Sequence, residues 1–407
     1  QRLKVCLRNV VLLLGMTLIV SSGFLHAGVM DKAAMEKAFP SPYVVGDKDE
    51  TLPVWPLYQQ ISTDTPLVGY AFESIDLAAI PGFAGIPFNL LVAIDPNGSF
   101  LSVRVLSHHE PVFLEGLGEK PLIDFAQQYT GISLMQNIKI DAKPTLGSAN
   151  NSANAYIDGV TKATASVRIF NQSLLSSSLK VAREKLGYAK GRDPDLIARI
   201  KPDMFEPMSW QELVDEGLIV KYRFSNQEVE TLFAGTIGEG QDPEGAEAPD
   251  ETFVELYAAN LTVPTVGRNL LLPQAWEYIK NNIGSNDQLL LVLGKGRYSF
   301  VGEDFVRGKV PERLSLNQAD LPIEMRDFDL DDRLSLFDLE YKLKLPDDLE
   351  GFEWKLFHVI GQAGLDPAYP AEFKLNVTRQ KGWLYPESAT EGLAFKVPIP
   401  QHYVAAA

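Results

Sequence analysis

The chain of 407 residues has a single cysteine and an excess of acidic over basic side chains. Cys6 lies close to the N-terminus, so the rest of the chain offers no thiol for a disulfide, a structural zinc site or an iron–sulfur cluster. The 53 acidic residues outnumber the 37 lysines and arginines, and the formal net charge is −16. Nucleic-acid binding needs clustered positive charge, so we expect no nucleic-acid partner. The acidity fits either a basic partner surface or plain solubility.

Long apolar runs are also scarce, and the first one lies near the N-terminus. Arg2, Lys4 and Arg8 precede the apolar run 10–20, and segment 21–28, rich in small residues, follows it. The run is shorter than the roughly 20 residues that a membrane span prefers. This order predicts a secretory signal peptide over residues 1–27, cleaved near Ala27, with retention as a short anchor as the alternative.

The first half of the chain alternates strand and helix patterns. Apolar, β-branched runs at 88–94 and 100–108 flank Asp95-Pro96-Asn97-Gly98, which is typical of a hairpin turn. Residues 167–187 form a longer amphipathic pattern that predicts a helix. These patterns indicate a mixed domain at 51–188, after a connector at 28–50.

The second half is mainly β in pattern. Ser209-Trp210-Gln211-Glu212 resembles a capping box that opens a helix, residues 273–284 predict another, and 235–251 predict a loop rich in Gly, Pro and acidic residues. Short apolar or alternating runs predict strands at 221–226, 252–264, 287–294, 297–302, 335–346, 352–361 and 371–379. We expect a linker at 189–208, an α/β connecting domain at 209–320 and a β-rich, sandwich-like domain at 321–407. The expected class is therefore α+β, with a mixed N-terminal domain before a mainly β part whose C-terminal strands are sandwich-like.

The motif with the most specific chemistry is Asp-Gly-Val-Thr-Lys-Ala-Thr-Ala-Ser at 158–166. It closely resembles the acceptor sequence on which flavin transferases attach FMN through a phosphoester. The resemblance implies a covalent FMN on Thr164, with an acceptor motif that comprises Asp158, Thr161, Lys162, Ala163 and Ser166. Such a link needs an exposed hydroxyl, a small neighbour and polar groups near the phosphate.

The same motif also fits an ordinary helix N-terminus. Asp158 or Thr161 could cap the helix that follows, since short polar side chains accept hydrogen bonds from its first N–H groups. Both interpretations can hold together, because a helix N-terminus is itself an anion site. Lys162 stands where the acceptor motif usually has glycine, which adopts positive φ without steric cost. A lysine there could place an ammonium beside the phosphate.

The segments before the motif resemble, in the same order, the small FMN-binding domain of the Rnf and Na-pumping quinone reductase subunits. Strands joined by Asp-x-x-Gly lead to His108-His109-Glu110, a loop with Gly116-Leu117-Gly118, a helix and then the flavin acceptor. The resemblance implies that His108, Glu110 and Gly118 belong to the flavin pocket. It makes the mixed domain an FMN-binding domain with FMN as its cofactor.

Two longer strings resemble the extracytoplasmic part of the NosR/NirI family. They are Leu-Tyr-x-Ala-x-Leu-Thr-x-Pro at 256–264 and Tyr-Ser-Phe-x-Gly-x-x-Phe-Val-Arg-Gly at 298–308. In that family an exported part precedes a polytopic membrane region and cytoplasmic ferredoxin-like clusters, and the system supports the expression and activity of nitrous oxide reductase. The resemblance implies a periplasmic piece of a larger inner-membrane protein. Its implied partners are a flavin transferase, nitrous oxide reductase or its assembly factors, and the membrane and iron–sulfur region of the same protein.

We therefore expect an electron-transfer flavoprotein module rather than a stand-alone enzyme, with no catalytic residue and no metal ligand assigned. One alternative is a redox-sensing or assembly module that docks a periplasmic partner without electron transfer. Another is a binding protein that keeps the fold without the flavin, for which Lys162 is the best support.

Overall fold

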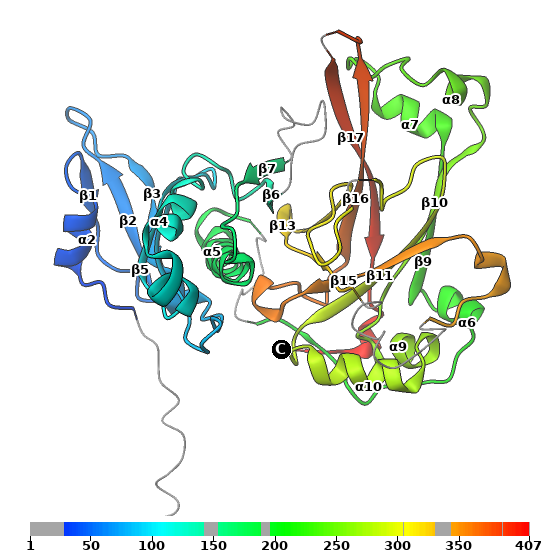
Figure 1. The fold of residues 1–407 in the computed structure, drawn as a ribbon, viewed down its shortest axis with the longest axis horizontal. Coiled ribbons are helices and arrows are strands. Elements are labelled where there is room, and N and C mark those ends of the chain that lie inside the picture. The colour runs from blue at the N-terminus through cyan, green and yellow to red at the C-terminus, as the bar shows by residue number, and fades with distance from the viewer. Residues whose placement is uncertain are drawn as a thin grey trace, which may run out of the picture.

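The chain forms an α+β protein, as the sequence predicts, in which a mixed N-terminal part adjoins a larger and mainly β part (Figure 1). The computed structural model describes residues 28–141, 154–188, 196–303, 305–329, 343–384 and 386–406. The predicted signal peptide at 1–27 and most of the strand predicted at 335–346 lie outside the described residues. Among the described helices, none is long and apolar enough to cross a membrane.

The N-terminal part is built on one antiparallel sheet whose strands pair in chain order. The strands are β1 (Tyr43–Val45), β2 (Val54–Gln59), β3 (Leu67–Glu73), β4 (Asn89–Ile94) and β5 (Phe100–Ser107). The predicted hairpin is confirmed: β4 pairs with β5, and Asp95 Oδ1 accepts hydrogen bonds from the N–H groups of Asn97 and Ser99. The helices of this part are α2 (Lys32–Ala38), α3 (Ser74–Leu77), α4 (Lys120–Gln127), α5 (Thr164–Lys185) and a π-helical stretch (Val112–Leu117); β6 (Asn137–Ile140) and β7 (Asn154–Ile157) form a parallel pair.

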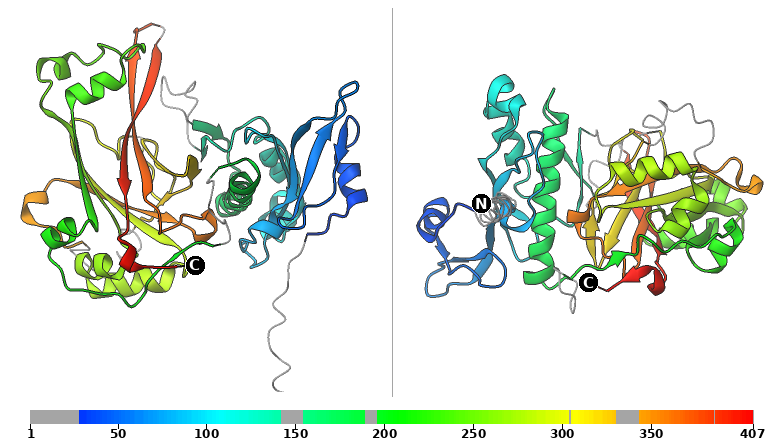
Figure 2. Two further views of the ribbon diagram at one scale, coloured as in Figure 1. Left: turned by 180° about the vertical axis from the view of Figure 1, so that it is seen from behind. Right: turned by 90° about the horizontal axis from the view of Figure 1, so that it is seen from below.

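Strand β4 is buried on both faces, which explains its uninterrupted apolar sequence. Successive side chains of a strand point to opposite faces of the sheet. Leu91 and Ala93 pack in the cluster that includes Met35 of α2. Leu90 and Val92 pack in the large core cluster that also contains residues of α4 and α5. The sheet is therefore covered by α2 on one face and by α4 and α5 on the other (Figures 1 and 2).

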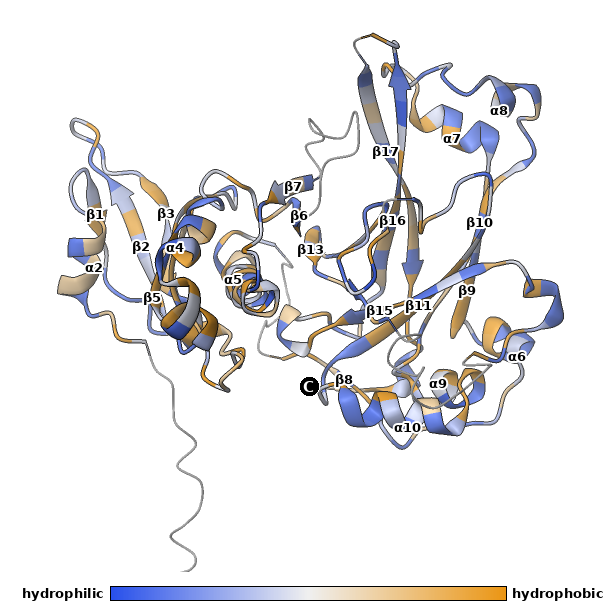
Figure 3. Ribbon diagram, in the orientation of Figure 1, coloured by the Kyte–Doolittle hydropathy of each residue, from blue (hydrophilic) through white to orange (hydrophobic). Residues whose placement is uncertain are grey.

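The mainly β part consists of two antiparallel sheets. One has the order β14-β15-β11-β10-β9 and the other β13-β12-β16-β17. Residues of both sheets, such as Leu256 and Leu290 from one and Phe373 and Phe395 from the other, share a core, which is the sandwich-like arrangement that the sequence predicts. Figure 3 shows hydrophobic residues along β9 and within these sheets.

The elements of this part are as follows. The strands are β8 (Arg199–Ile200), β9 (Ile219–Ser225), β10 (Thr252–Asn260), β11 (Gln288–Gly296), β12 (Leu314–Gln318), β13 (Leu321–Ile323), β14 (Arg326–Asp327), β15 (Glu353–Val359), β16 (Ala371–Lys381), β17 (Glu387–Val397) and β18 (Val404–Ala405). The helices are α6 (Trp210–Asp215), α7 (Asn226–Leu232), α8 (Pro243–Glu247), α9 (Pro264–Leu270) and α10 (Pro273–Asn282), with 3₁₀ turns at Asp347–Leu349, Gly361–Ala363 and Gln401–Tyr403.

Strand pairing joins the two segments that the sequence divides at residue 320. β15 pairs with β11, and β12 pairs with β16, so each sheet takes strands from 209–320 and from 321–407. The capping box predicted at Ser209 is present, since Ser209 and Glu212 exchange side-chain and backbone hydrogen bonds at the start of α6.

Three local predictions for this part are wrong. Residues 297–302 form no strand, because the chain leaves β11 at Gly296, where φ is +154°, and Arg297 turns to pair with Asp242. The loop predicted at 235–251 contains α8, whose first turn Asp242 caps. Strand β17 escaped prediction because its first half is polar and only its second half alternates between buried and exposed residues.

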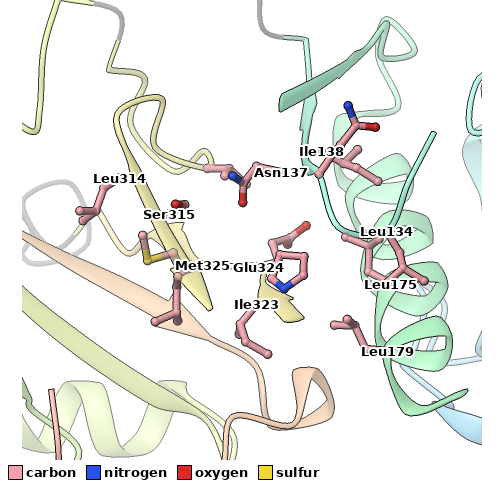
Figure 4. Close-up of a pocket in the computed structure, with 14 residues that line it drawn as sticks. Leu134, Asn137, Ile138, Leu175, Leu179, Leu314, Ser315, Ile323, Glu324 and Met325 are labelled. Atoms are coloured by element: carbon pink, nitrogen blue, oxygen red, sulfur yellow. The ribbon is translucent and has the colours of Figure 1, made fainter. Parts of the chain in front are cut away.

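Helix α5 lies between the two parts of the molecule (Figures 1 and 2). Leu175 and Leu179 of α5 face Ile323 and Met325 across a small cavity of about 30 Å³ (Figure 4). One buried polar chain crosses the same boundary. Tyr129 Oη donates to Asn171 Oδ1 at 2.7 Å, and Asn171 Nδ2 in turn donates to Glu324. Burial raises the pKa of Tyr129 well above its usual value, so its hydroxyl remains a donor.

A second polar contact across this boundary is a buried ion pair. Lys139 Nζ lies 2.7 Å from Glu312 Oε2 and also donates to the carbonyl oxygens of Pro311 and Glu312. The Lys139 side chain is 2% exposed and that of Glu312 is 13% exposed. The pair therefore fixes β6 against the mainly β part at a site with little solvent screening.

We predict that Lys139→Met lowers the free energy of unfolding by about 3 kcal/mol, because it leaves the Glu312 carboxylate without its buried partner. Urea denaturation measures this loss. The matched control is Lys120→Met, since Lys120 pairs with Asp124 on the surface and the two side chains are 82% and 55% exposed. Removal of such a pair costs less than about 1 kcal/mol. Equal losses in the two variants would contradict a structural role for the Lys139 pair.

Candidate functional site

The loop between β7 and α5 carries most of the predicted site residues and is held at both of its first two positions. The N–H of Asp158 donates to Gln128 Oε1 at 2.9 Å, and Gln128 Nε2 donates back to the Asp158 carbonyl at 3.0 Å. The N–H of Gly159 donates to Asp141 Oδ1 at 2.9 Å. A Cβ on residue 159 would lie 2.3 Å from that oxygen, so only glycine fits here. These contacts fix where the loop begins.

A tight turn then leads the loop into the helix. The N–H of Ala163 donates to the Val160 carbonyl at 2.9 Å, and Lys162, the third residue of this turn, has a φ of +69°. Turns with positive φ at the third position favour glycine. Lys162 thus adopts the backbone conformation expected of the glycine that the acceptor motif usually has, and its side chain is exposed.

Thr164 is the first residue of α5, and its side chain is exposed. The N-cap position is Ala163, and no side chain caps the helix. The capping that sequence predicts for Asp158 or Thr161 is therefore wrong, and both of these residues are exposed instead. The first N–H groups of a helix carry partial positive charge, so an uncapped N-terminus favours an anion.

Ser166 and Glu110 connect the first turn of α5 to another loop. Ser166 Oγ donates to Glu110 Oε2 at 2.5 Å, and the N–H of Phe83 donates to Glu110 Oε1 at 2.8 Å. Glu110 is only 1% exposed. Gly82 is required beside it, since a Cβ there would lie 2.3 Å from Glu110 Oε1. The buried carboxylate thus ties loop 81–87 to the start of the acceptor helix.

His108 is buried next to this carboxylate. Its Nδ1 accepts from the N–H of Glu110 at 3.2 Å, so the proton of the neutral ring lies on Nε2, which donates to Glu119 Oε2 at 2.9 Å. The His108 ring stacks on Phe88 with a centroid distance of 5.9 Å. His108 therefore holds the segment that leads to Glu119 and α4, and its ring faces other side chains rather than solvent.

Gly118 ends the π-helical stretch with a φ of +79°, and nothing lies within 4 Å of the position that a Cβ would take. Phe83, Leu114 and Leu117 are exposed large apolar side chains, Phe83 being 73% exposed. Phe83 is bound to Glu110 through its N–H, and the π-helical stretch follows Glu110 in the chain. Exposed apolar groups of this kind mark ligand or partner surfaces.

The structure thus places the predicted residues in two sets, namely the acceptor loop 158–164 and the buried group of His108, Glu110 and Ser166, with Gly118 at the end of the π-helical stretch. Sequence reasoning missed Gln128 and Asp141, which anchor the loop, and Phe83. Each acts through a contact between residues distant in the chain, for which the local sequence gives no signal. Within the described ranges, no group of three or more His, Cys, Asp or Glu side chains is arranged to hold a metal ion.

Residues 82–176 match the family model of the FMN-binding domain. The match begins at the loop bound by Glu110 and continues into α5, so it includes every predicted site residue. Over 349 residues the chain is 34% identical to the regulatory protein NosR of Stutzerimonas stutzeri, and over 355 residues 30% identical to that of Pseudomonas aeruginosa. It is 27% identical over 368 residues to the protein NirI of Paracoccus denitrificans. The chain belongs to the NosR/NirI family.

These alignments cover 84%, 87% and 90% of the chain but 46%, 47% and 48% of the three relatives. The chain thus spans about half the length of the curated relatives that it matches. Its FMN-binding domain makes FMN the cofactor of this NosR/NirI family chain, in a regulatory or electron-transfer role.

We predict that Lys162→Gly raises the free energy of unfolding by up to about 1 kcal/mol, because glycine adopts positive φ without the steric cost that a Cβ brings. Lys162→Ala is the matched control. It removes the same exposed ammonium but keeps the Cβ, and we expect no gain from it. Thermal or urea unfolding of both variants measures the difference, and equal stabilities would contradict backbone strain at this turn.

Proposed function

We propose that Thr164 carries FMN through a phosphoester and that the chain acts as a periplasmic electron-transfer module of a larger inner-membrane protein. One observation carries this proposal. Thr164 presents an exposed hydroxyl at the first position of an uncapped helix, directly after a turn in which Lys162 has the φ of the motif's glycine.

The residues around Thr164 fit a phosphate. The uncapped helix N-terminus offers N–H groups and partial positive charge, and the exposed Lys162 adds an ammonium two residues before the hydroxyl. Ala163 is small and buried, so it anchors the turn without covering the hydroxyl. Asp158, Thr161 and Ser166 complete the proposed acceptor motif, in which Ser166 binds Glu110 rather than the phosphate.

Attachment needs a transferase and an activated FMN donor, such as a flavin dinucleotide. In that transfer, Thr164 Oγ loses its proton and bonds to phosphorus, while the pyrophosphate bond breaks and a nucleoside monophosphate leaves. The exposure of Thr164 matters here, because the hydroxyl must enter the active site of another protein. Once bound, FMN supplies the redox chemistry, and the protein orients it and tunes its surroundings.

The apolar ring system of a flavin would find partners in Phe83, Leu114 and Leu117, which are exposed on segments bound to or following Glu110. We propose that His108 and Glu110 belong to the pocket as positioning residues. Their buried hydrogen bonds hold loop 81–87 and the segment before α4 in place. Gly118 keeps the end of the π-helical stretch free of side-chain atoms.

The partners follow from the family. We propose that electrons pass from a membrane and iron–sulfur region of the full-length protein to the flavin and support nitrous oxide reductase. The alternative is a redox-sensing or assembly module that docks a periplasmic partner. The name "regulatory protein" of the NosR relatives favours it, as does the burial of α5 against the larger β part, which would transmit a change at the flavin.

We predict that peptide mapping by mass spectrometry finds an FMN adduct on the peptide with Thr164, when the protein is exported from cells that contain a flavin transferase. Thr164→Val should abolish the adduct. Thr161→Val is the matched control, because it removes another exposed hydroxyl from the same loop and should keep the adduct. An unmodified Thr164 in the wild-type protein would refute covalent attachment.

The two roles are separated by a kinetic measurement. In membranes that contain the full-length protein, the electron-transfer role requires Thr164→Val to stop the delivery of electrons to nitrous oxide reductase within one turnover. A sensing role instead predicts normal delivery by preassembled reductase and a loss that appears only when new reductase is made.

A further inference from the structure

The beginning of the described chain is bound to two acidic side chains of the FMN-binding domain. The N–H of Gly28 donates to Asp76 Oδ1 at 2.6 Å. The next two N–H groups, of Val29 and Met30, donate to the two carboxylate oxygens of Glu73 at 2.8 and 2.7 Å. Three consecutive backbone nitrogens therefore face two carboxylates.

Both carboxylates have fixed positions. Glu73 is the last residue of β3, and Asp76 lies in the short helix α3 that follows it. Glu73 is 2% exposed, and its Oε2 also accepts from Asn89 Nδ2 at 2.7 Å. The N-terminal segment thus binds to a preformed surface rather than to a movable loop.

The charges at this surface do not balance. Lys48 Nζ lies 3.5 Å from Asp76 Oδ2, whereas Glu73 has no cationic partner among the described side chains. Two carboxylates and one ammonium leave one negative charge beside the nitrogen of Gly28. A buried carboxylate without a counter-charge is costly, and a peptide N–H supplies only a dipole. An α-ammonium would supply a full positive charge and stronger hydrogen bonds.

Gly28 is also the residue type that the site requires. A Cβ there would lie 2.5 Å from Asp76 Oδ2 and 2.6 Å from Glu73 Oε1. In the sequence, Gly28 follows Ala27, a small residue of the kind found before signal-peptide cleavage sites, and an apolar run with basic residues before it. Two independent features, the carboxylate pair and the sequence before it, therefore converge on the same nitrogen atom.

We propose that the bond between Ala27 and Gly28 is hydrolysed on export and that Asp76 and Glu73 bind the new α-ammonium of Gly28. Water adds across the peptide bond, so that Ala27 leaves with a carboxylate and Gly28 keeps the amine, which takes up a proton. The ion pairs exist only after processing. They tie the segment before α2 to α3, which packs against the acceptor helix α5.

The first test is peptide mapping of the mature protein from its host. We expect an N-terminal peptide that begins at Gly28 with a free amine. A protein that retains residues before 28, or that begins at another residue, overturns the proposal. Neither outcome depends on flavin attachment, so this test is separate from that of Thr164.

The second test measures the protonation of the new terminus. The rate of acylation of the α-amine at pH 8 is followed by mass spectrometry in the wild type and in Asp76→Asn and Glu73→Gln. An opposite charge raises the pKa of an α-amino group, ordinarily about 7.7–8.0, by at least about one unit, so we expect the wild-type amine to react several-fold to tenfold more slowly than in the variants. Asp47→Asn, which removes an exposed carboxylate paired with Lys32, is the matched control and should not change the rate. Equal rates in the wild type and in folded Asp76→Asn and Glu73→Gln would overturn the proposal.

The pH dependence of stability gives a third readout, which also shows whether the variants fold. The charged groups that face the amine are Glu73, Asp76 and Lys48. Because the pKa of the amine is higher in the folded state, its stabilisation is complete below about pH 7.7 and is lost as the pH rises through the folded value. The melting temperature of the wild type should therefore exceed that of Glu73→Gln at pH 7, and the difference should shrink by pH 10. A difference that is constant over this range contradicts an ammonium at the site.

Discussion

The burial of α5 on two sides is the constraint on which the rest of the structure depends. Its residues pack in the core of the FMN-binding domain and also line the boundary with the β sheets. Ser177 and Ser178 donate their hydroxyls to carbonyl oxygens of the preceding turn, so these small polar residues can be buried without unpaired donors. Only the N-terminal turn of the helix reaches the surface with exposed side chains, and Thr164 lies there. Core packing far from the site thus sets the position of the hydroxyl.

Local geometry then decides what the hydroxyl can do. The anchors at Gln128 and Asp141 fix the loop, the turn at Lys162 directs the chain into the helix, and the absence of a side-chain cap leaves the first N–H groups available. A capping side chain would compete with a phosphate for these same donors. The strained backbone at Lys162 is tolerated because the surrounding contacts determine the path of the loop, as is common at functional sites.

Sequence patterns could predict the hairpin of β4 and β5, the helix α5 and the capping box at Ser209, because each rests on contacts within a few residues. The acceptor motif was recognisable for the same reason. The hydrogen bond between Ser166 and Glu110 was not, since the two residues are far apart in the chain and nothing local reports their contact. Strand β17 was missed for a related reason. Its polar half is held by pairing with β16 along its whole length, and such pairing leaves no mark on hydrophobic periodicity.

The contacts of α5 also connect the proposed electron-transfer and regulatory roles. Glu110 holds its first turn, while near its other end Arg183 donates to the Ala363 carbonyl of the β part at 2.9 Å and Lys185 pairs with Asp49 of the N-terminal part at 2.7 Å. A helix transmits displacement along its axis because its backbone hydrogen bonds resist stretching, whereas a loop would absorb it. A partner that shifted the β part would therefore press on the same helix that presents Thr164. Coupling of this kind requires two arrangements of the boundary between the parts, and the small cavity beside Glu324 is the place where side chains have room to adopt a second one.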